Sequence, residues 1–264
     1  MKTKKLIKSA INQLGFDLTK LPKENLVKPL RMEGEIGFYK TELGDFYLPL
    51  NAPEDIVINC IKAGKIFESE VVETAKRFIK KGSVVLDVGA NFGQMSILFS
   101  QLVGEDGIVY AFEADDYVFE ILKKNIEANK CKNIIPVFGA VYNQSGKEFF
   151  FPKQDFQRFA AYGSYGIDPN AQDGRIVKSL MIDDYDFAKP VSFMKVDIQG
   201  SDLFAMQGAK STIEKHKMPI LFEFEQQFQE EFGTSFQDYV EFANSINYKF
   251  SETVIAVNYL ISPK

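Results

Sequence analysis

The sequence predicts a doubly wound α/β fold, because strand-like and helix-like segments alternate from residue 84 onward. Short apolar runs, typical of strands that are buried on both faces, alternate with segments whose apolar residues recur at helical spacing. Alternation of this kind predicts a mostly parallel sheet with right-handed crossover helices on both faces. The strand-like runs cover residues 84–88, 107–113, 133–139, 191–197 and 219–225.

Helices are predicted between these strands by apolar spacing. The clearest case lies between the second and third strands, where apolar residues recur at i, i+3, i+4 and i+8 from Val118 to Ile126. Residues 140–180 break the rhythm with many turn-forming residues, and such insertions often hold binding residues. Further helices are expected over residues 53–80, 93–103, 201–215 and 235–246, and two final strands over 247–251 and 254–261.

The chain is expected to form one α/β domain over residues 51–264, preceded by an appendage over residues 1–50. Within the appendage, residues 2–16 predict a basic amphipathic helix, and residues 36–50 alternate as the strands of a β-hairpin do. Such a helix can lie on an anionic membrane, dock a partner or pack on its own domain. The sequence leaves these three roles open.

Composition and charge exclude several classes of protein. A net charge of −5 argues against a nucleic-acid binder that depends on bulk electrostatics. Cys60 and Cys131 form no CxxC pair and His216 is the only histidine, so a Cys/His zinc site is excluded. Free cysteines indicate a reducing compartment, and no apolar run approaches the roughly 18 residues of a membrane span. We therefore expect a cytoplasmic protein, with peripheral membrane contact through residues 2–16 left open.

The most informative segment is the turn that follows the first predicted parallel strand. Asp87 lies near the end of that strand, and Gly89, Ala90, Asn91 and Gly93 lead into a helix. Backbone N–H groups at such a helix start bind polar or anionic groups of a cofactor. The spacing does not match G-x-G-x-x-G, which disfavours an NAD-dependent oxidoreductase. It fits the D-x-G-x-x-x-G pattern of S-adenosylmethionine (SAM) enzymes, with Asn91 in place of a middle glycine because asparagine tolerates positive φ.

Other cofactor-binding candidates follow the next two strands, at the edge where open α/β sheets bind ligands. Glu113 closes the second strand, 24 positions after Gly89, and can accept two hydrogen bonds from the ribose hydroxyls of an adenosine. Ala114, directly after it, is assigned to the same site. Gly139 and Ala140 end the third strand and are small enough for an adenine ring to lie against the backbone.

Carboxylates also close the fourth and fifth strands, as Asp197 and as Glu223 with Glu225. A hydroxyl acceptor must lose its proton, and a positioned base accelerates that step by about 10²–10⁴-fold. Asp197 is the first candidate base, with Glu223 or Glu225 as the second. Asp197 can equally hold the cofactor amino group or cap the next helix. The three carboxylates have the oxygen ligands that Mg²⁺ needs, but a metal is not expected. Glu68 and Glu70 can reach the cofactor, but a plain helix start is the expected interpretation.

Several segments, taken in order and spacing, resemble the FkbM family of SAM-dependent methyltransferases. The resemblance covers about residues 64–263 and implies a class I methyltransferase (Rossmann-like) fold with a mostly parallel seven-stranded sheet. It also implies SAM as methyl donor, S-adenosylhomocysteine as product and transfer to oxygen, often of a sugar or natural-product hydroxyl. Gln199 and Asp202 stand where the family frequently has glutamate. The matching segments are VLDVGANFG (85–93), AFEAD with LKKNIEAN (111–129), MIDDY (181–185), MKVDIQGSDLFAMQGA (194–209), LFEFE (221–225) and NYLISP (258–263).

These observations together predict a SAM-dependent O-methyltransferase that acts on a sugar hydroxyl of a glycan or its precursor. Methylation of a lipid-linked or peptide natural product is the alternative within enzymes, and a non-catalytic SAM-binding module is the alternative outside them. The base candidates argue against the second alternative. In the insertion, Tyr162, Ser164 and Tyr165 are the candidate acceptor wall, because tyrosine faces stack on sugar rings. An exposed hairpin is the other interpretation of that segment.

Overall fold

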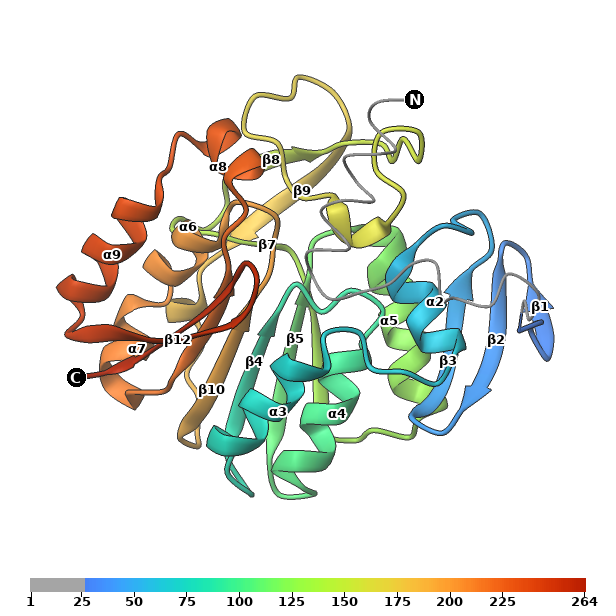
Figure 1. The fold of residues 1–264 in the computed structure, drawn as a ribbon, viewed down its shortest axis with the longest axis horizontal. Helices are drawn as coiled ribbons and strands as arrows, with labels where there is room; N and C mark the ends of the chain where they lie inside the picture. The colour runs from blue at the N-terminus through green and yellow to red at the C-terminus, as the bar shows by residue number, and fades with distance from the viewer. Residues whose placement is uncertain (1–26) are drawn as a thin grey trace.

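A seven-stranded sheet forms the centre of the protein, seen in a computed structural model that describes residues 27–264 (Figure 1). Its strand order is β12-β13-β11-β10-β4-β5-β6. The five neighbouring strands from β11 to β6 pair in parallel. β13 runs antiparallel to its neighbours β11 and β12. The predicted mostly parallel seven-stranded sheet is therefore confirmed. The strands are β4 (Val84–Val88), β5 (Ile108–Glu113), β6 (Ile134–Phe138), β10 (Val191–Val196), β11 (Ile220–Glu223), β12 (Tyr248–Ile255) and β13 (Asn258–Pro263).

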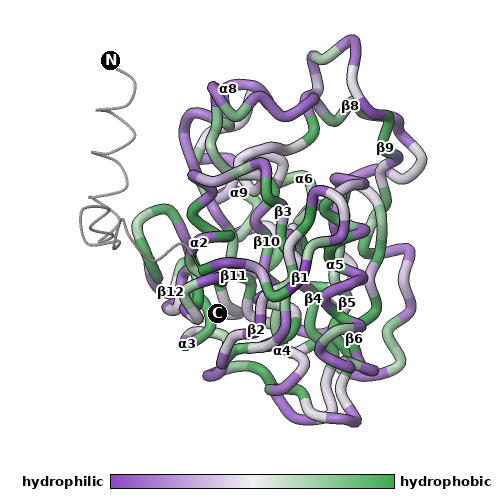
Figure 2. Tube along the Cα trace, turned by 90° about the vertical axis from the view of Figure 1, so that its right-hand side faces the viewer, coloured by the Kyte–Doolittle hydropathy of each residue, from purple (hydrophilic) through white to green (hydrophobic). Residues whose placement is uncertain are grey.

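Helices cover both faces of this sheet, and each face has its own apolar core. In β4, Val85 packs into the core of one face, whereas Leu86 and Val88 pack into the core of the other. Burial on both faces explains why the parallel strands read as continuous apolar runs. Figure 2 shows these apolar segments along β4 and β5. One face carries α3 (Ser69–Phe78), α4 (Gln94–Val103) and α5 (Asp116–Ala128), and the other carries α6 (Asp202–Gln207), α7 (Lys210–His216) and α9 (Phe236–Ser245).

Two predicted helices are each broken in two. The segment 53–80 contains α2 (Ile56–Lys62) and α3, separated by a turn in which Gly64 has a φ of +66°. The segment 201–215 contains α6 and α7, separated at Gly208, whose missing Cβ would lie 2.0 Å from the carbonyl oxygen of Tyr142. A further short helix, α8 (Gln226–Phe232), follows β11 and was not predicted.

A small antiparallel sheet precedes the α/β core, made of β1 (Arg31–Glu33), β2 (Ile36–Thr41) and β3 (Gly44–Pro49). The predicted hairpin is thus present, and it packs against α5. The buried Asn125 side chain joins three segments there: it accepts from the Tyr47 N–H (2.6 Å) and donates to the carbonyls of Tyr47 (3.1 Å) and Phe92 (2.8 Å). The hairpin is therefore fixed to the helix and to the turn that follows β4.

The insertion after β6 forms a second small sheet, in the order β7-β9-β8. Its strands are β7 (Ala140–Val141), β8 (Glu148–Phe151) and β9 (Arg175–Leu180), and η3 (Ile182–Asp184) leads on to β10. Between β8 and β9, residues 152–174 make a long connection, here called the insertion loop, which contains the 3₁₀ turn η2 (Tyr162–Ser164).

The helix predicted over residues 2–16 lies outside the described residues, and the membrane contact expected of it lies outside them too. From residue 27 to the C-terminus, the structure contains no helix of the length and apolarity that crossing a membrane requires.

Asn125→Leu is expected to lower the free energy of unfolding by about 3 kcal/mol, because it leaves the Tyr47 N–H and the Phe92 carbonyl buried without partners. Urea denaturation measures this change. Asn244→Ala, at an exposed position of α9, is the control and should stay within about 0.5 kcal/mol of wild type. An Asn125→Leu protein as stable as the control would show that this side chain does not hold the hairpin.

Candidate active site

Two adjoining cavities open at the edge where the parallel strands end. The first, here called the β5 pocket, is lined by Glu113, Ala114 and Ala140 among others, and the second, the β11 pocket, by Glu68, Glu223 and Glu225 among others. The two cavities share five lining residues, which therefore form their junction. These are Gly89, Asn91, Gly163, Asp197 and Gln199.

The turn after β4 has the backbone that its sequence predicts. Gly89, Asn91 and Gly93 have φ values of +83°, +51° and +88°. A Cβ on Gly89 would lie 1.9 Å from the carbonyl oxygen of Asp197, so glycine lets the turns after β4 and β10 touch. Gly93 lines neither pocket and instead packs beside Leu122, while Ala90 lines the β11 pocket.

Glu113 ties this turn to the end of β5. Its carboxylate accepts three backbone hydrogen bonds, from Asn91, Ala114 and Asp115, each at 2.8 Å. A carboxylate offers about four acceptor sites, so about one remains for a ligand in the β5 pocket. Burial raises the pKa of Glu113 to about 7 despite these bonds. Glu113 therefore has room for about one hydrogen bond from a ribose, whereas the sequence predicts two.

The β5 pocket fits a flat ring next to a group that carries hydrogen-bond donors. Ala114, Gly139 and Ala140, all predicted from the sequence, line it together with Val118 and Phe112. The Oδ1 atom of Asn91, at the junction, is buried and has no hydrogen-bond partner within the described residues. A buried acceptor of this kind is costly unless a ligand donates to it.

Below the turn, a buried ammonium group links β4 to β10. Lys195 Nζ lies 3.3 Å from Asp197 Oδ2, 3.7 Å from Asp87 Oδ1 and 3.3 Å from the carbonyl oxygen of Gly89. Burial opposes its charge, but Asp197, Asp87 and Glu68 raise the pKa of Lys195. Asp87 itself lines neither pocket and accepts from the Ser96 hydroxyl. Lys195 is not among the residues predicted from the sequence, although its place two residues before Asp197 puts both side chains on one face of β10.

The three predicted catalytic carboxylates meet in the β11 pocket. Burial and then the charge of Asp197 raise the pKa of Glu223 well above its ordinary value. The pKa of Glu225 is also raised, mainly by burial. Gln199 Nε2 donates to Asp197 Oδ1 at 3.2 Å and to Glu223 Oε2 at 2.8 Å, so one amide bridges two of the three carboxyl groups.

Glu68 joins this group: it stands at the start of α3, as the sequence predicts, and it also lines the β11 pocket. It precedes α3 in a left-handed conformation and makes no capping hydrogen bond. Its Oε1 atom accepts from Asn258 Nδ2 at 3.4 Å, and burial together with Asp197 raises its pKa to about 7. Glu70, by contrast, is exposed on α3 and lines neither pocket.

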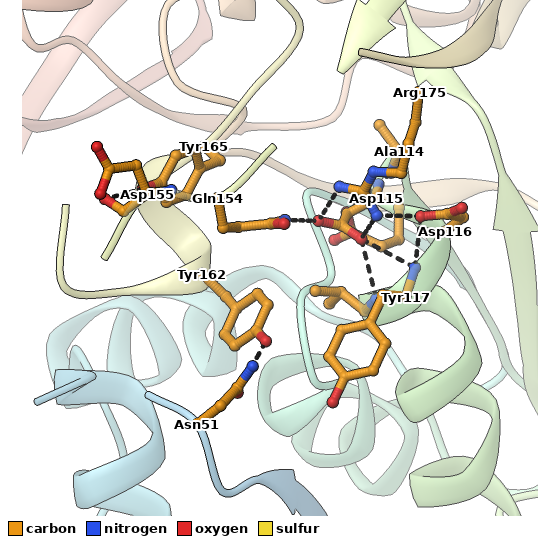
Figure 3. Close-up of polar contacts among 12 residues, drawn as sticks. Asn51, Ala114, Asp115, Asp116, Tyr117, Gln154, Asp155, Tyr162, Tyr165 and Arg175 are labelled. Carbon is orange, nitrogen blue, oxygen red and sulfur yellow. Dashed lines mark hydrogen bonds and ion pairs between the residues drawn. The ribbon is translucent and has the colours of Figure 1, made fainter. Parts of the chain in front are cut away.

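The insertion loop lines both pockets, so the three residues predicted as an acceptor wall are divided between them. Ser164 lines the β11 pocket, but Tyr162 and Tyr165 line the β5 pocket instead. The Tyr162 N–H donates to Asp55 Oδ2 at 2.8 Å, and its hydroxyl bonds Asn51 Oδ1 at 3.0 Å (Figure 3). Both partners precede α2, so the start of the α/β domain fixes the tip of the loop.

The base of the same loop is fixed by one buried carboxylate. Arg175 forms two 2.9 Å hydrogen bonds with Asp115, which also accepts from Gln154 (Figure 3). Asp115 is the N-cap of α5, accepting from the Tyr117 N–H at 2.9 Å. A bidentate contact of this kind stabilises the pair and also fixes the orientation of the guanidinium and carboxylate groups. The insertion loop is therefore held both at its tip and at its base.

Two further observations concern metal ligands and histidine. Residues 27–264 contain no group of three or more His, Cys, Asp or Glu side chains arranged to hold a metal ion. His216 accepts a hydrogen bond from the Val191 N–H at 3.3 Å, at the start of β10. It therefore lies at the edge of the sheet opposite to the pockets.

The sheet, the glycine turn after β4 and the acidic end of β5 define a class I SAM-dependent methyltransferase. The chain matches the methyltransferase FkbM domain over residues 87–250, and it belongs to this family. Its cofactor is SAM, as the sequence predicts.

Named relatives share short segments with the chain. It is 36% identical over 67 residues to the probable cobalt-precorrin-6B C(15)-methyltransferase (decarboxylating) of Sulfolobus acidocaldarius, covering 25% of this chain and 35% of that protein. It is also 36% identical over 64 residues to the protein-L-isoaspartate O-methyltransferase of Thermotoga maritima, covering 24% and 20%. The chain thus spans about a third or less of these curated relatives. Their names include transfer to carbon and to oxygen, so they do not identify the acceptor.

Among solved structures, the chain is similar to the methyltransferase FkbM from Methylobacillus flagellatus, with 16% identity and a TM-score of 0.46 over 72% of this chain and 50% of that one. It is also similar to M. jannaschii TYW2 in complex with AdoMet, with 15% identity and a TM-score of 0.43 over 89% and 90%.

A further buried acid lies behind the β11 pocket. Asp202 is fully buried; its Oδ2 accepts from the Gly200 N–H at 3.2 Å, and its Oδ1 has no partner within the described residues. Burial, and then the charge of Asp197, raise its pKa from an ordinary value of 3.8 to about 7. The folded protein therefore retains a proton there that the unfolded chain releases above about pH 4.

From this proton we expect the free energy of unfolding to fall as pH rises from about 4.5 to 6.5, by about 1.4 kcal/mol per pH unit for this one group. The contribution is complete below pH 4 and lost above pH 7. Asp202→Asn should remove it, which urea denaturation at pH 5, 6 and 7 measures. Asp186→Asn, at an exposed position, is the control. The assignment fails if Asp202→Asn keeps the pH slope of the wild type.

Proposed function

We propose that this protein is a SAM-dependent O-methyltransferase whose acceptor is a hydroxyl group, most simply that of a sugar in a glycan or glycan precursor. The observation that carries this proposal is the junction of the two pockets at Asp197. On one side lies a pocket suited to a nucleoside, and on the other a pocket lined by carboxyl groups. A methyl group transferred between them passes beside this one carboxylate.

In this proposal, the residues around the β5 pocket hold the cofactor. Ala114, Gly139 and Ala140 contact the adenine, and Glu113 accepts from the ribose. When bound, SAM supplies a methyl group made electrophilic by its sulfonium sulfur. Asp87 acts from below the pocket, because its contacts with Ser96 and Lys195 fix the turn rather than the ligand.

Asp197 is the proposed base. Its side chain is 24% exposed at the junction, whereas Glu223 is almost completely buried. Lys195 and Gln199 both approach its carboxylate, which leaves it oriented to accept the proton of a hydroxyl group. Glu223 and Glu225 have raised pKa values, so they hold protons more readily and donate hydrogen bonds to other acceptor oxygens.

The lining of the β11 pocket supports a sugar as acceptor. Carboxyl and amide groups, including that of Gln227, line this pocket together with the aromatic residues Phe159 and Phe228. Polar groups of this kind bond the hydroxyls of a sugar, while aromatic rings contact its apolar C–H faces. We further propose a cytoplasmic location, in keeping with the two free cysteines.

Labelled SAM tests the proposed function directly. Purified protein is added to a lysate from cells that lack its gene, and label is counted separately in glycan, lipid, protein and nucleic-acid fractions. We expect label in the glycan fraction. Label in lipid or protein instead would discard the sugar and favour a lipid-linked or peptide acceptor, and label in no fraction would favour a non-catalytic module.

Asp197→Asn is the matched control for this assay. The asparagine keeps an oxygen that can accept from Lys195, so this variant should retain SAM binding, measured by calorimetry. It should lower the rate of labelling by about 10²–10⁴-fold because the base is lost. An Asp197→Asn protein that labels glycan at the wild-type rate would remove the role proposed for this residue.

A further inference from the structure

Gln199 lies at the junction of the two pockets in an unusual backbone conformation. Its φ is +54°, in the left-handed region that residues other than glycine enter rarely. Gly200 follows with a φ of +94°, and a Cβ on Gly166 of the insertion loop would lie 3.2 Å from the Cβ of Gln199. A tight turn on one side and the insertion loop on the other thus enclose this residue. Strained conformations of this kind cluster at functional sites.

The side-chain amide of Gln199 lies between two acids from neighbouring parallel strands. Its Nε2 atom donates to Asp197, after β10, at 3.2 Å and to Glu223, at the end of β11, at 2.8 Å. An amide nitrogen has two N–H donors, so both are used. Carboxyl groups held this close disfavour each other's charge unless something between them offsets it.

Glu223 has many acidic neighbours and no cationic partner of its own. None of the ion pairs formed within residues 27–264 includes Glu223. The nearby ammonium group of Lys195 pairs instead with Asp87 and Asp197. The hydrogen bond from the Gln199 amide is therefore the contact that favours the ionised form of Glu223 against its acidic neighbours. The charged groups that face Glu223 come from several elements: Asp197 after β10, Glu225 before α8, Glu68 before α3 and Asp202 on α6.

We propose that Gln199 is a positioning residue of the active site, whose amide occupies the place of a cation between the carboxyl groups of Asp197 and Glu223. It holds both groups at the junction of the pockets. The value of this arrangement for catalysis rests on the proposed function. The arrangement itself is measurable on the free protein, so its failure is distinguishable from a failure of the proposed reaction.

Gln199→Glu tests the proposal, since it replaces the amide with a carboxylate of the same shape. We expect the titration midpoint of Glu223 to rise by roughly one to three pH units, because a further carboxylate beside Glu223 disfavours its charged form. Gln199→Met, which only removes the donors, should raise it less. The measurement is ¹³C NMR of glutamate side-chain carboxyl groups, with the signal of Glu223 identified by its loss in Glu223→Gln.

Gln227→Glu is the matched control, because it places the same change in the same pocket. The amide of Gln227 donates to Glu225 and bonds neither Asp197 nor Glu223, and its side chain is exposed to solvent. We expect this variant to move the Glu223 midpoint by much less than Gln199→Glu does. Equal shifts in the two variants would overturn the proposal. Should Gln199→Glu fail to fold, the comparison of Gln199→Met with wild type decides, and an unchanged midpoint there overturns the proposal.

Mn²⁺ supplies an independent readout in the same proteins. In Gln199→Glu, three carboxylates meet at the place where the amide lay, so Mn²⁺ should bind there and broaden the amide NMR signals of Gly89 and Gly200. The wild-type protein should show no such broadening. Broadening in both proteins, or in neither, would contradict the claim that the amide takes the place of a cation.

Discussion

The contact on which the site depends is the buried ammonium group of Lys195 between the ends of two adjacent parallel strands. It joins Asp87 of β4 to Asp197 after β10 and also approaches the carbonyl of Gly89. A buried charge is tolerated only when it is paired, and Lys195 has a carboxylate partner on each of the two strands. Because Gly89 has no side chain, the two turns can touch. The cofactor turn and the proposed base are thus fixed relative to each other.

Burial raises the pKa of each of the remaining acids, Glu113, Glu68 and Glu223. Glu113 is held by backbone N–H groups and lines the β5 pocket, whereas Glu68 and Glu223 line the β11 pocket. The insertion loop lines both pockets, and Arg175, directly after it, bonds Asp115 at the start of the helix beside Glu113. The buried acids and the insertion loop therefore meet at the same two adjoining pockets.

Much of this can be predicted from the sequence, because parallel strands bring their ends to one edge. That rule by itself predicts that Glu113, Asp197 and Glu223 lie along the same edge of the sheet. The features that the sequence does not predict depend on contacts between distant segments. The chain between Glu68 and its partner Asn258 is far too long for any periodic pattern to connect them. The sequence around Tyr162 suggests a residue that stacks on a sugar. In the structure, its N–H and its hydroxyl are instead bonded to Asp55 and Asn51, just before α2.

Calorimetric titration of SAM into the wild-type protein and into Lys195→Met tests the central claim most directly. The account predicts one SAM site per chain in the wild type and an affinity at least about tenfold lower in the variant, a difference of about 1.4 kcal/mol. The loss is expected because Asp87 and Asp197 would lose the cation that lies between them and would separate, releasing the turn. Equal SAM affinity in a folded Lys195→Met protein would contradict the claim that this ammonium group holds the site together.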